Sequence, residues 1–225
     1  MERKIICTED GSHTLYIPEM DEHYHSMHGA VQESKHVFIE AGYNAVAKDK
    51  LIIFEVGFGT GLNALLTLKE SHINRKRVQY FSIEKYPLTP EEYSTLNYAQ
   101  IQGKQYSEYF LKLHQCNWDI PVEITNNFIF TKLRGDITNF CFDQLPLFDL
   151  IYFDAFAPNK QDGLWSSRIF NQLYTNSNNN AVLVTYCAKG EVRRTMQAAG
   201  FSVQRIPGPP GKREMIKAMK SPKEK

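Results

Sequence analysis

The residues best suited to chemistry in this sequence form a glycine-rich stretch that opens with an acid. Its members are Glu55, Gly57, Gly59, Gly61 and Asn63. Glycines allow a ligand to approach the backbone closely, because no side chain stands between them. The stretch follows a continuous apolar run at 51–56 and precedes a helix-prone segment at 62–70, so we expect a buried strand, a tight turn and a helix N-terminus. Such a turn predicts a binding site for a nucleotide-like ligand.

The spacing of the glycines and the acids around them distinguish between possible ligands. A dinucleotide fingerprint reads G-x-G-x-x-G and places a pyrophosphate on the helix N-terminus, whereas the spacing here is G-x-G-x-G. S-adenosylmethionine (SAM) has no phosphate and carries positive charge, which a carboxylate such as Glu55 suits. Glu84 ends the next apolar run, where Rossmann-like folds place the acid that accepts both ribose hydroxyls. The pattern therefore favours SAM over NAD. The alternative is that this stretch binds no ligand and is a tight turn with an acid that caps the helix.

A further acid, Asp154, follows the apolar run at 148–153. Parallel strands end at the edge where open α/β sheets bind ligands, and a buried carboxylate there is costly unless it is used or paired. In methyl transfer to an amine, such a carboxylate stabilises the ammonium as it forms and accepts the released proton. The aromatic rings of Phe156 and Trp165 are suited to stack on a flat base. Alternatively, Asp154 caps a turn and Trp165 belongs to the core.

Two other sets of polar residues have less specific patterns. Asp136 follows a predicted strand, where many SAM enzymes bind the adenine amino group, although Gly-Asp is also a common helix start. His23, His25 and His28 lie close together near the N-terminus. Zinc needs defined ligand geometry, and the sequence offers no partner cysteine or distant histidine, so we predict no metal. A solvated loop and a lid over substrate or cofactor are the two remaining interpretations of these histidines.

The elements that must position these residues alternate between strands and helices. Further strands are expected at 78–84, 122–125, 128–133, 181–186, 201–206 and 215–219. Asn126-Asn127 separates two of them and tolerates the positive φ of a tight hairpin. Alternation of this kind predicts an α/β fold of the Rossmann-like class I SAM-dependent methyltransferase type, with a mostly parallel sheet and helices on both faces. We divide the chain into an N-terminal cap with a helix at 31–41, a methyltransferase domain and a short tail, at 1–50, 51–220 and 221–225.

Composition is that of an ordinary globular protein. The 225 residues are 42% hydrophobic and 23% charged, which supports one sizeable core and argues against disorder. The cysteines are widely spaced, so neither a zinc knuckle nor a disulfide framework is indicated. Without a run of about 18 apolar residues, we expect a cytoplasmic protein. The formal net charge of +1 gives no global signal for nucleic acid, so a basic surface would have to be local.

Several motifs along the chain occur together in one known family. They are Tyr24-His25-Ser26, the stretch from Glu55 to Asn63, Glu84-Lys85-Tyr86-Pro87, Asp154-Ala155-Phe156-Ala157-Pro158 with Leu164-Trp165, and Lys212-Arg213-Glu214-Met215. On these motifs the chain resembles the methyltransferase domain of the MnmC family, which makes 5-methylaminomethyl-2-thiouridine at the wobble position of certain tRNAs. The resemblance covers most of the chain. Ala155 stands where the family commonly has glycine, and Asp162-Gly163 replaces the usual Asn-Pro.

The resemblance implies a set of roles for these residues. SAM would be held by Gly57, Gly59, Gly61, Asn63, Glu84 and Asp136, and Asp154 would face the amine that is methylated. On the substrate side we place Tyr24, His25, Phe156, Trp165, Arg193, Arg194, Lys212 and Arg213. The four basic residues of this set are expected to contact tRNA phosphates, and the alternative is a solvated surface.

The acceptor and the domain composition also follow from the resemblance. Two-domain members of the family continue into an FAD-dependent oxidase, whereas this chain resembles the stand-alone members. We therefore expect it to methylate a ready-made 5-aminomethyl group of 2-thiouridine. A small-molecule amine or a protein side chain is the alternative acceptor, because the glycine turn does not contact the acceptor. A non-catalytic scaffold of the same fold is disfavoured by the presence of Glu55, Glu84, Asp136 and Asp154 together.

Overall fold

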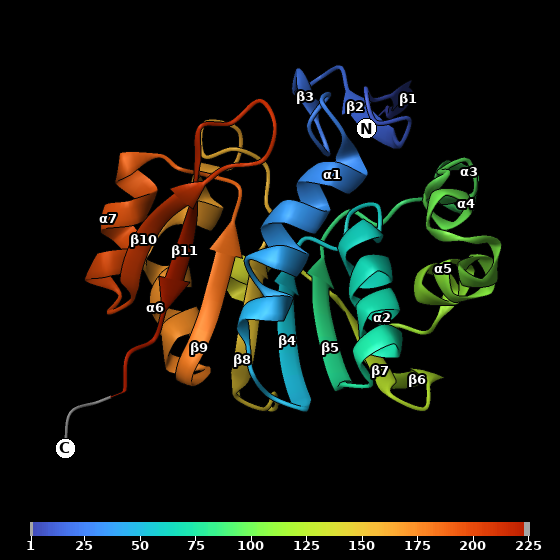
Figure 1. Cartoon of the computed structure of the whole chain (residues 1–225). Helices are drawn as coiled ribbons and strands as arrows, with labels where there is room; N and C mark the ends of the chain where they lie inside the picture. Colours follow the sequence, from blue (N-terminus) through green and yellow to red (C-terminus); the bar gives the residue numbers. More distant parts are fainter. Residues whose placement is uncertain (1, 223–225) are drawn as a thin grey trace.

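The computed structural model describes residues 2–222, apart from the side chain of Asp162, and has a central sheet with helices on both faces (Figure 1). In the described residues the sheet has the strand order β10-β11-β9-β8-β4-β5-β7-β6. The strands are β4 (Lys50–Val56), β5 (Arg77–Glu84), β6 (Pro121–Thr125), β7 (Phe128–Arg134), β8 (Phe148–Phe153), β9 (Ser177–Thr185), β10 (Ser202–Pro207) and β11 (Glu214–Met219). The predicted α/β class is confirmed.

Most strand pairs in this sheet are parallel. β4 pairs in parallel with both β5 and β8, and parallel pairing extends outward to β7 and β9. The antiparallel strands lie toward the edges, where β11 inserts between β9 and β10 and β6 pairs with β7. Because β9, β8, β4, β5 and β7 run in the same direction, their carboxyl ends meet at one edge, which is the upper edge in Figure 1.

Alternating side chains of the strands bury two apolar layers. The helices are α1 (Ala30–Ser34), α2 (Leu62–Asn74), α3 (Pro90–Ser94), α4 (Tyr98–Gln102), α5 (Ser107–Gln115), α6 (Ser167–Thr175) and α7 (Gly190–Ala198). Leu51 and Ile53 of β4 face the layer that contains α1 and α2, while Phe54 faces the layer that contains α6 and α7. This is the period-two pattern of a strand buried on both faces. No helix in the described part of the chain is long and apolar enough to cross a membrane.

The N-terminal segment is more regular than the sequence suggested. Lys4–Cys7 (β1), His13–Ile17 (β2) and Glu22–His23 (β3) form a small antiparallel sheet that we did not predict. It lies above the carboxyl ends of β4 and β5 (Figure 1). The predicted helix at 31–41 is present as α1 followed by a π-helical turn, Lys35–Glu40. This N-terminal segment therefore covers the edge of the sheet where the glycine turn lies.

The hairpin between β6 and β7 differs in detail from the prediction. The two strands are antiparallel as expected, with a register shift between Glu123 and Thr125. However, the non-glycine residues with positive φ in the described chain are Asp21, Arg75, Asp119 and Asn180. Neither asparagine of the Asn126-Asn127 turn adopts that conformation, because the irregular register accommodates the turn instead.

Candidate active site

A cavity of about 600 Å³ opens at the carboxyl edge of the sheet. It is lined by the turn after β4, the ends of β5, β7 and β8, the N-terminal segment and the β10–β11 loop. Of the predicted cofactor residues, those that line it are Gly57, Gly59, Asn63, Glu84 and Asp136. Asp154 lines it together with the predicted substrate-side residues Tyr24, His25, Phe156 and Lys212. Residues from distant parts of the sequence are thus brought to one cavity.

The glycine turn has the conformation that the sequence predicted. Gly57, Gly59 and Gly61 have φ values of +90°, +50° and +73°, a region that disfavours other residues. A Cβ atom on Gly57 would lie 2.6 Å from the carbonyl oxygen of Asp154, and one on Gly59 would lie 3.2 Å from the ring of Tyr24. The backbone at Gly57 and Gly59 is therefore open to a ligand because these two residues have no side chains.

Gly61 has a different environment from the other two glycines. It caps α2 in the left-handed conformation, and a Cβ atom on it would lie 2.8 Å from Nε2 of His114. Gly61 does not line the cavity. The predicted contact of Gly61 with the cofactor stays a prediction, and its lack of a side chain allows α5 to pack against the turn.

Glu84 and Asp136 lie at adjacent strand ends with their carboxylates held by hydrogen bonds. The backbone amides of Gly59 and Tyr86 donate to the two carboxylate oxygens of Glu84, at 2.9 and 2.7 Å. Asp136 accepts from the backbone amide of Thr138 at 2.9 Å and pairs with Lys85 at 2.8 Å. Partial burial opposes ionisation, but the hydrogen bonds from Lys85 and Thr138 hold the pKa of Asp136 below its usual value.

Glu55 does not lie where the sequence analysis expected it. Its side chain is 0% exposed, lies outside the cavity and accepts a hydrogen bond of 2.6 Å from the hydroxyl of Ser82. Burial raises the pKa of Glu55 to about 8. The expected attraction between a Glu55 carboxylate and the positive end of the ligand is corrected, because the side chain does not reach the cavity.

Asp154 is half-buried at the base of the cavity. Its backbone amide donates to the carbonyl of Val56 at 3.0 Å, and Nδ2 of Asn63 donates to its Oδ2 at 2.8 Å. Burial raises the pKa of Asp154 to about 7, and the nearby charge of Glu33 acts in the same direction. A carboxyl group with this pKa exchanges a proton readily near neutral pH.

An ion pair lines the cavity near Asp154. Nζ of Lys212, in the β10–β11 loop, lies 2.6 Å from Oε1 of Glu33 in α1 and 3.9 Å from the ring centroid of Tyr186. The other carboxylate oxygen of Glu33 accepts from the backbone amide of Ser26 at 2.8 Å. Lys212 was expected to contact phosphate. The structure instead places it inward, where its charge lowers the pKa of Asp154.

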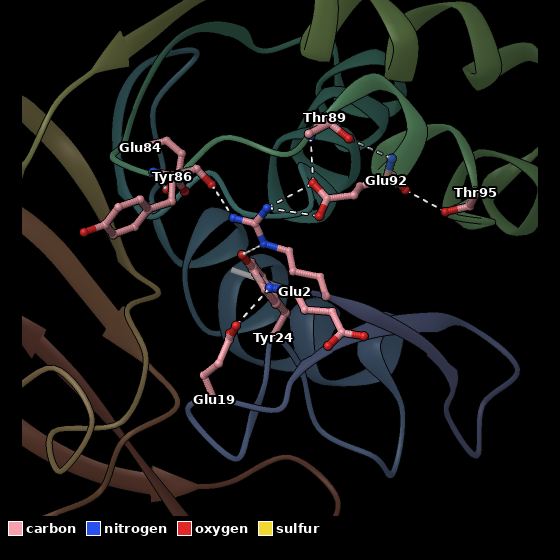
Figure 2. Close-up of polar contacts among 9 residues, drawn as sticks. Glu2, Glu19, Tyr24, Glu84, Tyr86, Thr89, Glu92 and Thr95 are labelled. Carbon is pink, nitrogen blue, oxygen red and sulfur yellow. Dashed lines mark hydrogen bonds and ion pairs between the residues drawn. The ribbon is translucent and has the colours of Figure 1, made fainter.

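Tyr24 and Phe156 form an aromatic pair in the cavity lining, with ring centroids 5.0 Å apart and nearly perpendicular planes. The hydroxyl of Tyr24 accepts from Nε of Arg3 at 2.9 Å. Arg3 also donates to the carboxylate of Glu92 at 3.0 Å and to the carbonyl of Tyr86 at 2.8 Å. These hydrogen bonds place Tyr24, Tyr86 and Glu92, which are labelled in Figure 2, around the guanidinium of Arg3. Arg3 was not singled out from the sequence, because its partners are distant along the chain.

The histidines near the N-terminus have separate environments. His25 is buried, with Nε2 2.8 Å from the hydroxyl of Thr60, and burial lowers its pKa to about 4. The ring of His23 packs against Tyr16 in a tilted arrangement, and His28 pairs with Glu9. Within the described residues, no group of three or more His, Cys, Asp or Glu side chains could hold a metal ion. His23 and His25 line the cavity, as the lid interpretation requires.

Four predicted substrate-side residues lie outside the cavity lining. Trp165 is buried in the core against Phe153, and its indole nitrogen donates to the carbonyl of Phe156 at 2.8 Å. The structure thus corrects the stacking role that we expected for Trp165, since the ring supports the segment of Phe156 instead. Arg193 and Arg194 lie on α7, and Arg213 is exposed in the β10–β11 loop.

The residues that line the cavity fit SAM. The turn at Gly57 and Gly59 leaves backbone open to the cavity, and no phosphate-binding cluster of basic side chains accompanies it among the described lining residues. Carboxylates at the ends of β5 and β7 suit the ribose hydroxyls and the adenine amino group, because both present donors. The residues that line the cavity can thus hold a nucleoside with a charged amino acid tail.

The sequence match assigns the family. Residues 96–221, more than half of the chain, match the family described as S-adenosyl-L-methionine-dependent methyltransferase. The chain belongs to this family, and it is an enzyme that uses SAM. The cofactor predicted from the glycine turn is therefore confirmed.

Particular relatives agree with this assignment. The chain is similar to the "tRNA 5-methylaminomethyl-2-thiouridine biosynthesis bifunctional protein MnmC" of Cupriavidus metallidurans, with 32% identity over 235 residues, 96% of this chain and 34% of that protein. The protein of the same name from Aeromonas hydrophila is 30% identical over 92% of this chain and 34% of its own length. The chain thus spans about a third of the length of these curated relatives.

A solved structure is similar over nearly the whole chain. The crystal structure of MNMC2 from Aquifex aeolicus superposes with a TM-score of 0.78 and 27% identity, and covers 98% of this chain and 72% of that one. The resemblance to the MnmC family predicted from the sequence is confirmed.

Proposed function

We propose that this enzyme transfers the methyl group of SAM to the amino group of a 5-aminomethyl-2-thiouridine at the wobble position of tRNA. The similarity to MnmC proteins, whose name specifies 5-methylaminomethyl-2-thiouridine biosynthesis, supports this product. The observation that carries the proposal is the position of Asp154, which lines the same cavity as the glycine turn and has a pKa of about 7. An amine acceptor needs such a group, because it must lose a proton to react.

Residues of the β4, β5 and β7 ends bind the cofactor in this proposal. The backbone of Gly57 and Gly59 and the second Nδ2 hydrogen of Asn63 contact the amino acid end, Glu84 accepts the ribose hydroxyls, and Asp136 accepts from the adenine. When bound, SAM supplies a methyl group on a positively charged sulfur. Glu84 is already oriented by Gly59 and Tyr86, so little ordering is needed on binding.

Asp154 acts on the acceptor nitrogen. An alkylamine is mostly protonated at neutral pH, and the ionised carboxylate takes up that proton so that the nitrogen lone pair becomes available. Asp154 lies in a partly buried site, where electrostatic interactions are stronger than in water. The hydrogen bond from Asn63 favours the ionised form of Asp154, which is the form that accepts the proton.

The acceptor base lies between protein groups of two kinds. Tyr24 and Phe156 offer aromatic surface for a pyrimidine ring. Lys212 and Glu33 form the polar wall next to Asp154, and His25, neutral because of its burial, adds no charge there. This combination accommodates a flat base that carries an amine, which favours a modified uridine over an aliphatic amine.

A direct test uses tRNA from cells that lack this protein. We expect mass analysis of their wobble uridines to show the 5-aminomethyl form accumulating and the 5-methylaminomethyl form missing. The purified enzyme and SAM should then restore the methyl group to this tRNA. Unchanged wobble uridines, together with methylation of a free amine or a peptide, would contradict the proposal.

A further inference from the structure

One buried carboxyl group has no part in the proposed reaction. Glu55 points from β4 to the face covered by α2, since it follows the alternation of Leu51 and Ile53. Its Oε2 accepts from the hydroxyl of Ser82 at 2.6 Å, whereas its Oε1 is buried without a hydrogen-bond partner. Buried polar atoms are nearly always paired, so this oxygen requires an explanation.

The side-chain amide of Asn63 also has one paired and one unpaired polar atom. Asn63, in the first turn of α2, donates from Nδ2 to Asp154 at 2.8 Å, but its Oδ1 is buried and has no partner. The amide of Asn63 and the hydroxyl of Tyr80 both lie against the carboxyl group of Glu55, and the Tyr80 hydroxyl is also unpaired. Unpaired oxygens therefore gather around one carboxyl group.

An ionised Glu55 leaves one of these oxygens without a donor. A carboxylate offers only acceptors, so the single hydroxyl proton of Tyr80 would have to serve both Oε1 of Glu55 and Oδ1 of Asn63. If the amide of Asn63 turned over to offer Nδ2 to Glu55, its Oδ1 would lie against the carboxylate of Asp154. A single proton on Glu55 removes the conflict, because its Oε1 then donates to Oδ1 of Asn63 while Nδ2 remains on Asp154.

We propose that Glu55 is a positioning residue that works as a neutral carboxylic acid and fixes the amide orientation of Asn63, so that Nδ2 is presented to Asp154. The raised pKa of Glu55, which burial causes, agrees with a protonated group at neutral pH. The hydrogen bond from Asn63 in turn lowers the pKa of Asp154. Glu55 thus acts on the acceptor site through Asn63, and this consequence rests on the proposed role of Asp154.

The decisive variant is Glu55→Gln, with Glu55→Leu as the matched control. Glutamine keeps the shape, carries no charge, donates from Nε2 to Asn63 and accepts from Ser82 through Oε1. Leucine has no donor. We expect Glu55→Gln to keep the wild-type SAM affinity and the wild-type midpoint of the pH–rate profile. Glu55→Leu should move that midpoint upward, because Asp154 loses its fixed donor and its pKa rises.

The proposal is overturned if Glu55→Gln weakens SAM binding by about tenfold or more, since that result would mean that the charge of Glu55 is used. It is also overturned if the two variants shift the midpoint equally.

A measurement that does not depend on activity is infrared spectroscopy of the folded protein near neutral pH. The carbonyl band of a protonated carboxylic acid should be present in the wild type and weaker in Glu55→Gln, and no difference between them would refute a neutral Glu55. Because this band is independent of the acceptor, it stays informative if the tRNA substrate is wrong.

Discussion

In the proposed function the cavity has two halves, one for the cofactor (the cofactor half) and one for the acceptor (the acceptor half). The cofactor half takes its residues from the ends of three neighbouring strands, whereas the acceptor half joins segments from opposite ends of the chain. Gly59, Glu84 and Asp136 form the cofactor half, and hydrogen bonds within the turns hold them. In the acceptor half, Asp154 is surrounded by the N-terminal segment and by Lys212 from the β10–β11 loop. The cofactor half is therefore ordered by strand pairing, and the acceptor half depends on contacts between distant segments.

The two halves also differ in protonation. In the cofactor half, hydrogen bonds from Lys85 and Thr138 keep the pKa of Asp136 low. In the acceptor half, burial raises the pKa of Asp154 to about 7. We conclude that proton exchange near neutral pH belongs to the acceptor half, as the proposed reaction requires, because its acceptor amine must lose a proton before methyl transfer.

The largest expected effect is the loss of SAM binding in the cofactor half. Gly59→Val should abolish measurable SAM binding and leave the fold largely intact, because φ is +50° and the ring of Tyr24 lies 3.2 Å from the added Cβ. Calorimetry measures the affinity, and circular dichroism checks the fold. Gly59→Ala, which adds the Cβ without branching, should retain part of the binding. Unchanged affinity in the valine variant would mean that the turn does not contact SAM.

The next effect is confined to the acceptor half. Asp154→Ala should lower the methylation rate by about 100- to 1000-fold, because one preorganised charged group is lost. SAM affinity should stay close to wild type, since the residues of the cofactor half are unchanged. Single-turnover kinetics and calorimetry separate the two quantities. A variant that turns over at nearly the wild-type rate would eliminate the proposed role of Asp154.

A smaller effect tests how the N-terminal segment joins the halves. Arg3→Ala removes the donors to Tyr24, Glu92 and Tyr86, and we expect SAM affinity to fall by about tenfold, since hydrogen bonds to charged groups contribute about 1.5–3 kcal/mol. Arg3→Lys keeps the charge but not the forked geometry, so its affinity should be intermediate. Wild-type affinity in both variants would show that the segment is held without Arg3.

The pH dependence of the methylation rate tests the raised pKa of Asp154 in the acceptor half. The wild-type rate should rise with pH through about 7 as Asp154 ionises. Lys212→Ala should move the midpoint of this rise to higher pH, because the lysine charge lowers the pKa of Asp154, and Lys212→Arg should move it less. The same pKa affects stability: protonated Asp154 contributes at low pH, and this contribution is lost as the pH rises through the folded-state value. A midpoint that moves downward in Lys212→Ala would contradict this electrostatic coupling.

The smallest expected effect concerns the surface outside both halves. The start of α7 and the β10–β11 loop lie at the upper edge of the sheet (Figure 1), and we predict that Arg193, Arg194 and Arg213 contact tRNA phosphates there. Replacing Arg194 and Arg213 with alanine should make the slope of log affinity against log salt shallower by roughly 0.7 to 0.9 for each lost contact. SAM affinity should not change. An unaltered slope would mean that tRNA binds at another face.

Much of the cofactor half follows from local sequence pattern. The continuous apolar run before Gly57 predicts a buried strand, and glycine is required wherever φ is positive and a ligand lies close to the backbone. Strand ends in a parallel sheet meet at one edge, so Glu84, Asp136 and Asp154 could be placed together before the structure was known. The three-stranded N-terminal sheet was missed, because its short strands are partly exposed and lack a clear alternating pattern.

Tertiary structure alone decided the charge and direction of several side chains. Local spacing made Glu55 a candidate ligand contact, but burial under α2 raises its pKa to about 8 and keeps it out of the cavity. Lys212 and Arg213 are adjacent in sequence, yet one pairs with Glu33 inside the cavity and the other is exposed. The sequence by itself determined the α/β sheet, the glycine turn and the acids at its edge, because these depend on residue type and short-range periodicity. Burial and pairing between distant residues set the pKa of each acid, and these appear only when the chain is folded.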